Sequence, residues 1–294
     1  MPYGEYDIFD NLEVVGEDYI WQMMRDNPTL IFRTAFLNER ILRVANCFYS
    51  ALDEEVHFYI PPESPLNPPK GDLRTYIKNN CFYDTDLDYN APLHVAFDAN
   101  SAISSIAICQ VDRDKNELRT VASMFVKTPH KIQDLVQKVC EYYLPKLKKE
   151  VVFYYDHTFI WTTANNTESY ADTIVRYFEK NRWEVTPVYI GQQPRYDWRH
   201  EQIDLALKGD NTLLFPLFNL YNNEYLKIAM EQSGVKMGKT GFEKDKTPES
   251  LPDSPEAPDE YKTHITDAWD TLFVGCNFHY KEPAGGFGGI IFLR

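Results

Sequence analysis

The clearest pattern of hydrophobic and polar positions begins at Pro92, after ninety residues without a sustained period. Three apolar runs of strand length follow one another closely, and turn residues 113–116 join the last two. Short apolar runs separated by such turns are typical of an antiparallel meander. We therefore expect strands at 93–98, 102–111 and 118–126.

The next part of the chain alternates helical and strand patterns. Apolar residues recur at three- and four-residue steps after Pro129, which predicts a helix. The whole order is then β-β-β-α-β-α-β-α, which favours a mixed sheet with helices on its faces. We expect helices at 129–148, 167–180 and 196–208, and strands at 151–155 and 184–190.

The end of the chain combines a polar stretch with one more helix. Residues 234–261 are rich in Lys, Pro and acids, which predicts a long surface loop. A helical pattern resumes at 263–276, with Ile265, Ala268, Trp269 and Leu272 on its apolar side. The glycine-rich tail at 282–294 allows no assignment.

The first ninety residues read as a linker or small subdomain. Helices are plausible at 17–25, 30–44 and 72–80, and five prolines within 60–69 indicate a loop. We therefore divide the chain into a linker segment, 1–90, and a main domain, 91–294.

Composition narrows the possible classes of protein. The chain has 294 residues, and 30 Lys+Arg against 44 Asp+Glu give a net charge of −14. This charge argues against a broad basic surface that grips nucleic acid by itself. No apolar run is long enough to span a membrane, and the first thirteen residues do not resemble a secretory signal. Five scattered cysteines suggest neither a disulfide framework nor a zinc site, so we expect a cytoplasmic protein.

Three acidic residues fall where a buried layer is expected. Asp98 and Asp156 each end an apolar strand, and Asp267 lies within the apolar-periodic helix. Buried carboxylates are costly unless they are paired or bind a cation, so three of them suggest a shared site. Each could instead be an ordinary turn, capping or solvent-facing residue.

Clustered carboxylate oxygens suit the hard ions Mg²⁺ and Mn²⁺. Two such ions about 3.5–4 Å apart can hydrolyse a phosphodiester bond, one activating water and the other stabilising the leaving oxygen. The sequence therefore predicts phosphodiester hydrolysis if the three acids meet.

The ordered motifs resemble the RNase H-like nucleases, and more narrowly the nuclease domain of the large terminase subunit of tailed bacteriophages. The matching segments are His94–Asn100, Val152–His157, Gly241–Lys246 and Thr263–Leu272. The resemblance implies an α/β fold with a mixed central sheet, three antiparallel strands followed by parallel strands, flanked by helices. It also implies a metal-binding catalytic triad of Asp98, Asp156 and Asp267.

The same resemblance suggests roles for neighbouring residues. Asp270 is a possible outer metal ligand, since it lies three residues beyond Asp267 on the helix. A DNA-phosphate or proton-transfer role is possible for His264, His157, Lys244 and Lys246. For the histidines a structural role is at least as common, and for the lysines a solvated loop is equally common.

The chain departs from the family in lacking a phosphate-binding loop. Residues 234–240 come closest to that motif, but they are one residue short and no helix pattern follows. We therefore expect this chain to be the nuclease part of a longer polypeptide with an ATPase motor. The resemblance then implies double-stranded DNA, the portal protein and the small terminase subunit as partners, two Mg²⁺ or Mn²⁺ ions as cofactors, and the infected bacterial cytoplasm as location.

Three functions remain open on sequence grounds. The first is a packaging endonuclease with little sequence preference, and the second is a junction resolvase or free-standing nuclease of the same fold. The acidic net charge disfavours a resolvase, which needs a basic junction-binding face. The third is a catalytically silent module that docks a motor to the portal, in which the acids only cap elements.

Overall fold

The computed structural model describes residues 8–26, 46–61, 80–161, 168–238, 241–254 and 257–280. Within them a seven-stranded sheet has the order β1-β7-β4-β3-β2-β5-β6, and β8 (Val235–Gly238) and β9 (Gly241–Lys244) form a separate hairpin. The main strands are β1 (Phe58–Tyr59), β2 (Leu93–Ala99), β3 (Ile103–Asp112), β4 (Glu117–Lys127), β5 (Glu150–Tyr155), β6 (Glu184–Tyr189) and β7 (Phe215–Asn219).

Strand directions in the sheet follow the expected plan. The strands β2, β3 and β4 pair antiparallel, whereas β5 pairs parallel with β2 and β6 pairs parallel with β5. This order, three antiparallel strands followed by parallel ones, confirms the RNase H-like α/β fold.

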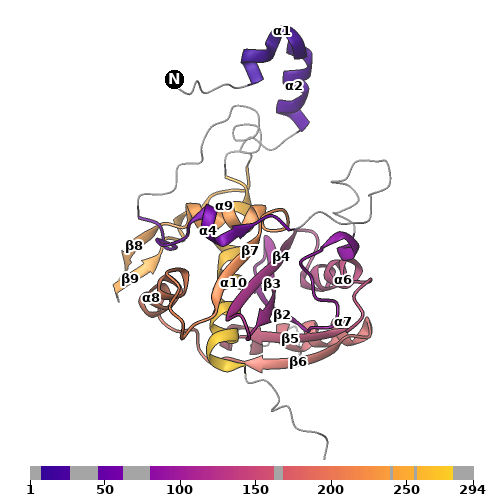
Figure 1. The fold of residues 1–294 in the computed structure, drawn as a ribbon, viewed down its shortest axis with the longest axis vertical. Helices are drawn as coiled ribbons and strands as arrows, with labels where there is room; N and C mark the ends of the chain where they lie inside the picture. Colours follow the sequence, from indigo (N-terminus) through magenta and orange to yellow (C-terminus); the bar gives the residue numbers. More distant parts are fainter. Residues whose placement is uncertain are drawn as a thin grey trace, which may run out of the picture.

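Helices cover both faces of this sheet (Figure 1). One face packs against α6 (Ile132–Tyr142) and α7 (Tyr170–Lys180), and the other against α8 (Tyr196–Leu207), α9 (Glu224–Gln232) and α10 (His264–Val274). The remaining helical segments are η1 (Ile8–Asn11), α1 (Leu12–Val15), α2 (Glu17–Asp26), α4 (Glu54–His57), η3 (Cys81–Tyr83), η4 (His157–Ile160), η5 (Thr247–Ser250), η6 (Asp259–Tyr261) and the π-helical η7 (Gly275–His279).

Alternation along the strands decides which residues face which helices. In β2, Val95 and Phe97 belong to the core beneath α6 and α7, whereas Ala96 belongs to the core beneath α10. Successive strand residues point to opposite faces, so Asp98 shares the α10 face with Ala96. The strand pattern thus directs this acid toward the helix that carries Asp267.

The end of α10 lies close against the sheet. A Cβ atom on Gly275 would stand 2.3 Å from the ring of Tyr154 on β5, so only glycine permits this approach. Trp269, fully buried on α10, donates a hydrogen bond from its indole nitrogen to Thr120 on β4 at 3.0 Å. These contacts fix α10 across the sheet.

The predicted strands from 93 to 190 and the helices α2, α7, α8 and α10 are confirmed within a few residues at their ends. The helix expected at 129–148 is wrong in extent, because α6 ends at Tyr142. Pro145 disfavours helical geometry in the residue before it, which explains the early end. The helices expected at 30–44 and 72–80, the proline-rich loop and the tail lie wholly or largely outside the described residues.

Residues before the expected boundary at 90/91 contribute to the main core. Phe48 and Tyr49 are buried in the cluster that contains α10, and β1 pairs parallel with β7. The backbone nitrogen of Phe48 donates to the carbonyl of Ser233 at 2.7 Å. The described segment 46–59 is therefore part of the body of the domain, and no division of the core falls at 90/91.

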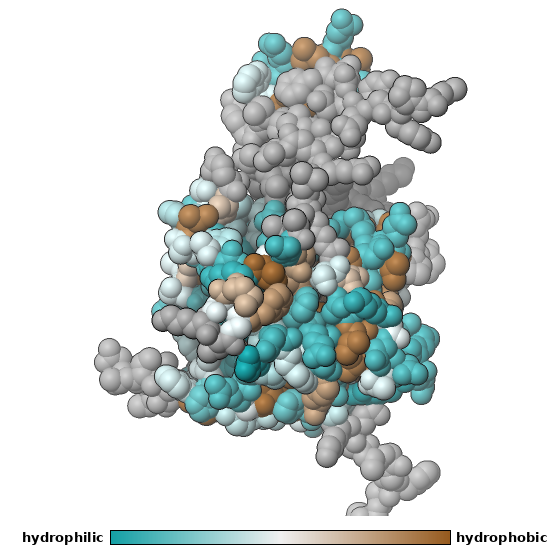
Figure 2. Space-filling model, turned by 90° about the vertical axis from the view of Figure 1, so that its left-hand side faces the viewer, coloured by the Kyte–Doolittle hydropathy of each residue, from teal (hydrophilic) through white to brown (hydrophobic). Residues whose placement is uncertain are grey.

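The expected surface loop at 234–261 is partly wrong. It contains the antiparallel strands β8 (Val235–Gly238) and β9 (Gly241–Lys244), which form a hairpin, followed by η5 and η6. A phosphate-binding loop would need a strand, a loop and a helix here. The two antiparallel strands therefore agree with the rejection of that motif at 234–240. Viewed from the side of α8 and the hairpin, the surface is mostly hydrophilic with small hydrophobic patches (Figure 2).

A helix that crosses a bilayer must be both long and apolar. None of the described helices is long and apolar enough to do so.

Candidate functional site

Two of the predicted acids lie at the same edge of the sheet. Ala96 on β2 is in parallel register with Tyr154 on β5, and Asp98 and Asp156 each follow this pair by two residues. Adjacent strands lie about 4.8 Å apart, so the two acids occupy corresponding places at the carboxyl ends of neighbouring strands. The structure therefore brings Asp98 and Asp156 to one end of the sheet.

Asp98 is in contact with the beginning of α10. Its Oδ2 lies 3.2 Å from Nδ1 of His264 and accepts a hydrogen bond from Asn100 Nδ2 at 3.0 Å. The Asn100 nitrogen also lies 2.8 Å from His264 Nδ1, so the three side chains form a closed polar group. His264 is three residues before Asp267, on the same side of the helix. This contact brings the first turn of α10, which carries Asp267, to Asp98.

Asp156 caps the short helix η4. Its Oδ1 accepts hydrogen bonds from the backbone nitrogen of Thr158 at 2.8 Å and from the Thr158 hydroxyl at 2.6 Å. This is the ordinary capping role that sequence considerations allowed. Both bonds use Oδ1, so Oδ2 can still bind a cation.

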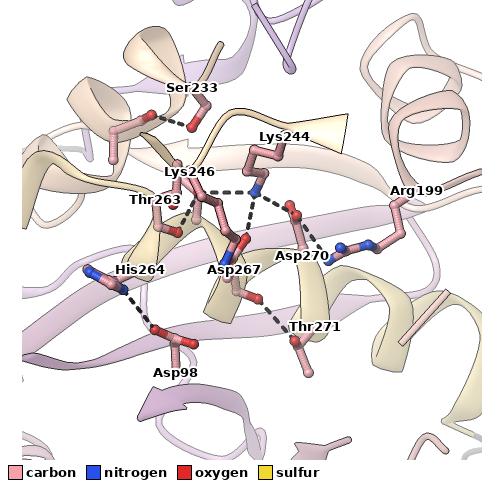
Figure 3. A network of polar contacts seen from close by, with 12 residues as sticks. Asp98, Arg199, Ser233, Lys244, Lys246, Thr263, His264, Asp267, Asp270 and Thr271 are labelled. Atoms are coloured by element: carbon pink, nitrogen blue, oxygen red, sulfur yellow. Dashed lines mark hydrogen bonds and ion pairs between the residues drawn. The ribbon is translucent and has the colours of Figure 1, made fainter. Parts of the chain in front are cut away.

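Asp267 is held by two lysines from the segment around the hairpin (Figure 3). Its Oδ1 lies 2.9 Å from Nζ of Lys244, and its Oδ2 pairs with Lys246. The Lys244 side chain is fully buried, whereas that of Lys246 is 36% exposed. Lys244 is therefore an internal cation, and only Lys246 fits the expectation of an accessible basic loop.

Asp270 lies deeper than Asp267 and has several partners of its own. Its Oδ1 accepts from the Tyr49 hydroxyl at 2.6 Å, and its Oδ2 lies 2.7 Å from Lys244 Nζ and 3.3 Å from Arg199 Nη1. Its side chain has no solvent exposure. Both oxygens of Asp270 are therefore engaged, and they hold Lys244 and Arg199 in position. This arrangement does not favour the predicted role of Asp270 as an outer metal ligand.

The charges around the site shift the pKa values of the predicted residues. Burial raises the pKa of Asp98, and the negative charge of Asp267 adds to this effect while His264 opposes it. Burial alone would raise the pKa of Asp267, but Lys244 and Lys246 outweigh burial and hold this pKa far below its usual value. Burial likewise opposes a charged His264, yet its hydrogen bond to Asp98 prevails and raises its pKa. Asp267 and His264 are thus both stabilised in their charged forms.

His157 turns toward aromatic neighbours. Its Nδ1 lies 3.0 Å from the Tyr189 hydroxyl, and its ring meets that of Trp161 edge-on at 5.7 Å. Although it follows Asp156 directly, His157 is exposed and belongs to a cluster of rings.

The chemistry of these donors fits Mg²⁺ or Mn²⁺, since all three acids offer carboxylate oxygens. As the side chains stand, no group of three or more His, Cys, Asp or Glu among the described residues is arranged to hold a metal ion. Both oxygens of Asp267, which a metal would need, are paired with lysines. Ser105, directly opposite Asp98 in the β2–β3 register, has a buried hydroxyl without a hydrogen-bond partner among the described residues, which fits an additional group beside Asp98.

Several residues that contact the predicted acids or their lysine partners are not among the residues predicted from the sequence. Asn100, two positions after Asp98, could have been noticed as a polar side chain at a strand end. Tyr49 and Arg199 come from distant parts of the chain, and no local pattern connects them to α10. Thr266, whose hydroxyl lies 3.1 Å from Lys244 Nζ, looks like an ordinary helix residue.

Comparison with known proteins gives matches to solved structures alone. No protein-family model and no curated protein matches the chain. The large terminase of a thermophilic bacteriophage, solved as the whole protein, is 11% identical over 92% of this chain, with a TM-score of 0.45. The P22 large terminase nuclease domain is 12% identical and covers 80% of this chain and 94% of its own length, with a TM-score of 0.46.

This chain is similar to large terminases. It spans 54% of the length of the whole thermophilic-phage terminase. The large terminase nuclease of thermophilic phage G20c, solved with bound magnesium, is 11% identical over 77% of this chain and 97% of its own, with a TM-score of 0.39. At such identities the similarity concerns the fold and assigns no role to an individual residue.

Proposed function

We propose that this chain is the nuclease part of a large terminase, a metal-dependent endonuclease that cuts double-stranded viral DNA during genome packaging. Asp98, Asp156 and Asp267 are its metal ligands and catalytic residues. The working ions are two Mg²⁺ or Mn²⁺, and the cut has little sequence preference. An ATPase motor in the same polypeptide, the portal protein and the small terminase subunit complete the machinery, in the cytoplasm of the infected bacterium.

One observation supports this proposal above the others. Asp98 and Asp156 end neighbouring parallel strands in corresponding places, and His264 contacts Asp98 one helical turn before Asp267. We infer from this arrangement that the three carboxylates can approach one another at one end of the sheet. An acid that merely caps its own element needs no such neighbours.

Each side chain then has a distinct task. When bound, the two divalent ions would activate a water and stabilise the leaving oxygen. Charged His264 orients Asp98 and can donate a proton or bind a phosphate oxygen. Lys244 and Lys246 keep Asp267 ionised, and the more exposed Lys246 can move from Asp267 to the DNA phosphate. Asp270, Tyr49 and Arg199 position Lys244 and do not touch the substrate.

The acidic net charge fits a cutter that receives its DNA from a motor. Nonspecific DNA affinity comes mainly from neutralised phosphates, and a chain of charge −14 has little of it. DNA that is delivered and held by other components requires little affinity from the nuclease itself.

A second candidate is the catalytically silent docking module. It is favoured by the pairing of both Asp267 oxygens with lysines, which satisfies the buried charge without any metal. In that case the polar network only stabilises α10 against the hairpin.

Cleavage of a supercoiled plasmid separates the two candidates. The reaction is run with EDTA, Mg²⁺ or Mn²⁺ on the parent chain and on Asp98→Asn, with Asp114→Asn as a matched control. Asp114 is an exposed acid in the β3–β4 turn, at the opposite end of β3 from the site. We expect metal-dependent nicking by the parent and the control, and a loss of at least about a hundredfold in Asp98→Asn.

Either of two results would contradict the nuclease proposal. The first is an absence of cleavage with both ions, which supports the docking module. The second is full activity in Asp98→Asn, which means that cutting resides elsewhere.

A further inference from the structure

A group of exposed aromatic rings lies directly after Asp156. Trp161 is 66% exposed and Tyr189 is 46% exposed, and both contact His157, which lies between them. The Tyr189 ring also packs against Tyr155 at 5.6 Å. We call Tyr155, His157, Trp161 and Tyr189 the aromatic platform. It stands at the carboxyl ends of β5 and β6, at the same sheet edge as the candidate catalytic acids.

A cavity of about 520 Å³, lined by both polar and apolar groups, lies near this platform. Its lining includes Lys131 at the start of α6, and Tyr170 and Arg176 on α7. The half-exposed Tyr170 packs against Phe159 at 6.0 Å, and Phe159 belongs to η4, the same short helix that carries His157. The helix η4 therefore links the platform to the cavity.

The cavity also reaches the acidic site. Asn100 lines the cavity and at the same time donates to Asp98 and contacts His264. A polymer that fills the cavity would thus pass beside Asp98.

The charge of the cavity is opposite to that of the chain as a whole. Its ionised lining side chains are Lys131 and Arg176 against one acid, Glu168, while the entire chain carries −14. Arg176 pairs with Glu168 through Nε at 2.6 Å and Nη2 at 2.7 Å. Of the two cationic lining residues, Lys131 is the one outside this ion pair.

Exposed rings beside cationic side chains are a combination that binds unpaired nucleic-acid strands. In a duplex the base faces are stacked on one another, so exposed rings gain contact only with bases that have left the stack. The cavity has hydroxyl, amide and charged groups beside apolar ones along its lining, which suits a strand that presents both phosphates and bases.

We propose that the aromatic platform and the cavity together bind an unpaired DNA strand next to the acidic site, with bases stacked on Trp161 and phosphates beside Lys131 and Arg176. This inference rests on the proposed nuclease function and deepens it. It makes a frayed or locally melted segment the preferred substrate within double-stranded DNA.

Fluorescence anisotropy in EDTA tests the proposal without cleavage. The probes are a fluorescein-labelled single strand of about twenty thymidines, a length that covers one or more binding sites of this kind, and a duplex of the same length with the same label. The proteins are the parent, Trp161→Ala, Trp161→Phe, and Trp21→Ala as a control that removes an exposed tryptophan from α2.

We expect the parent to bind the single strand more tightly than the duplex. Trp161→Ala should weaken single-strand binding by at least about fivefold, consistent with about 1–3 kcal/mol per stacked base. Trp161→Phe should retain most of the affinity, and Trp21→Ala all of it. Lys131→Ala should reduce the salt dependence of single-strand binding by about one counterion.

Any of three results would overturn the proposal. Trp161→Ala could lose affinity equally for the single strand and the duplex, it could bind the single strand unchanged, or the parent could bind the duplex more tightly than the single strand. Because these measurements contain no metal, they are independent of catalysis. A parent that binds the single strand as expected but cuts no plasmid contradicts the nuclease function alone. A parent that cuts plasmid while Trp161→Ala binds the single strand normally contradicts this inference alone.

Discussion

Two buried aspartates on opposite faces of the sheet have very different surroundings. Asp270, on the α10 face, accepts from the Tyr49 hydroxyl and lies within 3.3 Å of nitrogens from Lys244 and Arg199. Asp84, near α6, accepts from the Tyr142 hydroxyl at 2.8 Å. Burial raises the pKa of Asp84 to about 7, and the charge of Asp86 adds to this rise.

The difference shows where the fold concentrates charge. A tyrosine hydroxyl does not by itself keep the buried Asp84 ionised at neutral pH, whereas Asp270 is surrounded by two cations. On the α10 face, Lys244 and Lys246 hold the pKa of Asp267 far below its usual value, so carboxylate charge is maintained there.

The largest expected effect is that of removing the buried cation. Lys244→Met leaves Asp267 and Asp270 close together with half of their compensation lost, which should lower the free energy of unfolding by about 3–5 kcal/mol. Urea denaturation measures this change. The control is Lys236→Met on the same hairpin, whose side chain is 44% exposed, and it should cost less than about 1 kcal/mol. Equal, small losses of unfolding free energy in both variants would show that Lys244 is not the main cation that compensates Asp267 and Asp270.

Asp84 gives the next effect, with a size that depends on pH. Because its folded-state pKa is about 7 against an ordinary 3.8, the folded protein binds the proton more tightly, and stability declines as pH rises from about 4 to 7. Asp84→Asn removes this decline, so the variant should exceed the parent by about 1–3 kcal/mol at about pH 8 and match it near pH 4. Urea titrations at the two pH values decide this. A variant less stable than the parent at the higher pH would contradict the comparison.

The two tyrosines sharpen the contrast further. Tyr49→Phe removes a bond to an aspartate flanked by cations and also an acceptor for Lys244 at 3.0 Å, which should cost about 1.5–3 kcal/mol. Tyr142→Phe removes the bond to Asp84 and a long one, 3.4 Å, that the hydroxyl accepts from Asn222, and it should cost about 1 kcal/mol. Thermal and urea unfolding at neutral pH compare the two variants. A larger loss of unfolding free energy in Tyr142→Phe than in Tyr49→Phe would contradict the claim that the α10 face holds the stronger polar network.

The smallest effect on stability is expected at Lys246. This partly exposed lysine pairs with Asp267 Oδ2 and, at 3.3 Å, with Glu249. Lys246→Gln should change stability by less than about 1 kcal/mol but bind Mn²⁺ severalfold more tightly, because a competing cation has left Asp267. Calorimetric titration with Mn²⁺ measures this, with Lys236→Gln as control. Weaker binding in Lys246→Gln would mean that the lysine helps to recruit the ion.

Much of the sheet could be predicted because its signals are local. The strands from 93 to 190 are apolar runs of the right length, and the acid at the end of each of two strands is visible in the sequence. In contrast, no local pattern predicts β7 or α9, and the segment 46–59 falls within the predicted linker. Its place depends on distant partners, such as the Phe48–Ser233 backbone bond, which no local pattern reveals.

The polar network was predictable only in part. Asp98, Asp156 and Asp267 stood out because an acid interrupts an apolar pattern. The burial of Lys244 did not, since lysine in a polar stretch normally indicates solvent. Its 1% exposure arises from Asp267 and Asp270 on α10 and from the rings of Phe48 and Tyr49, which the fold brings together from three parts of the chain.

Calorimetric titration of Mn²⁺ into the parent, Asp98→Asn and Asp267→Asn tests the central claim most directly, because it measures ion binding apart from any DNA. We predict binding by the parent and by the Asp114→Asn control, and its loss in both site variants. Binding that persists unchanged in Asp98→Asn and Asp267→Asn, or its absence in the parent, would contradict the claim that these carboxylates form a metal site.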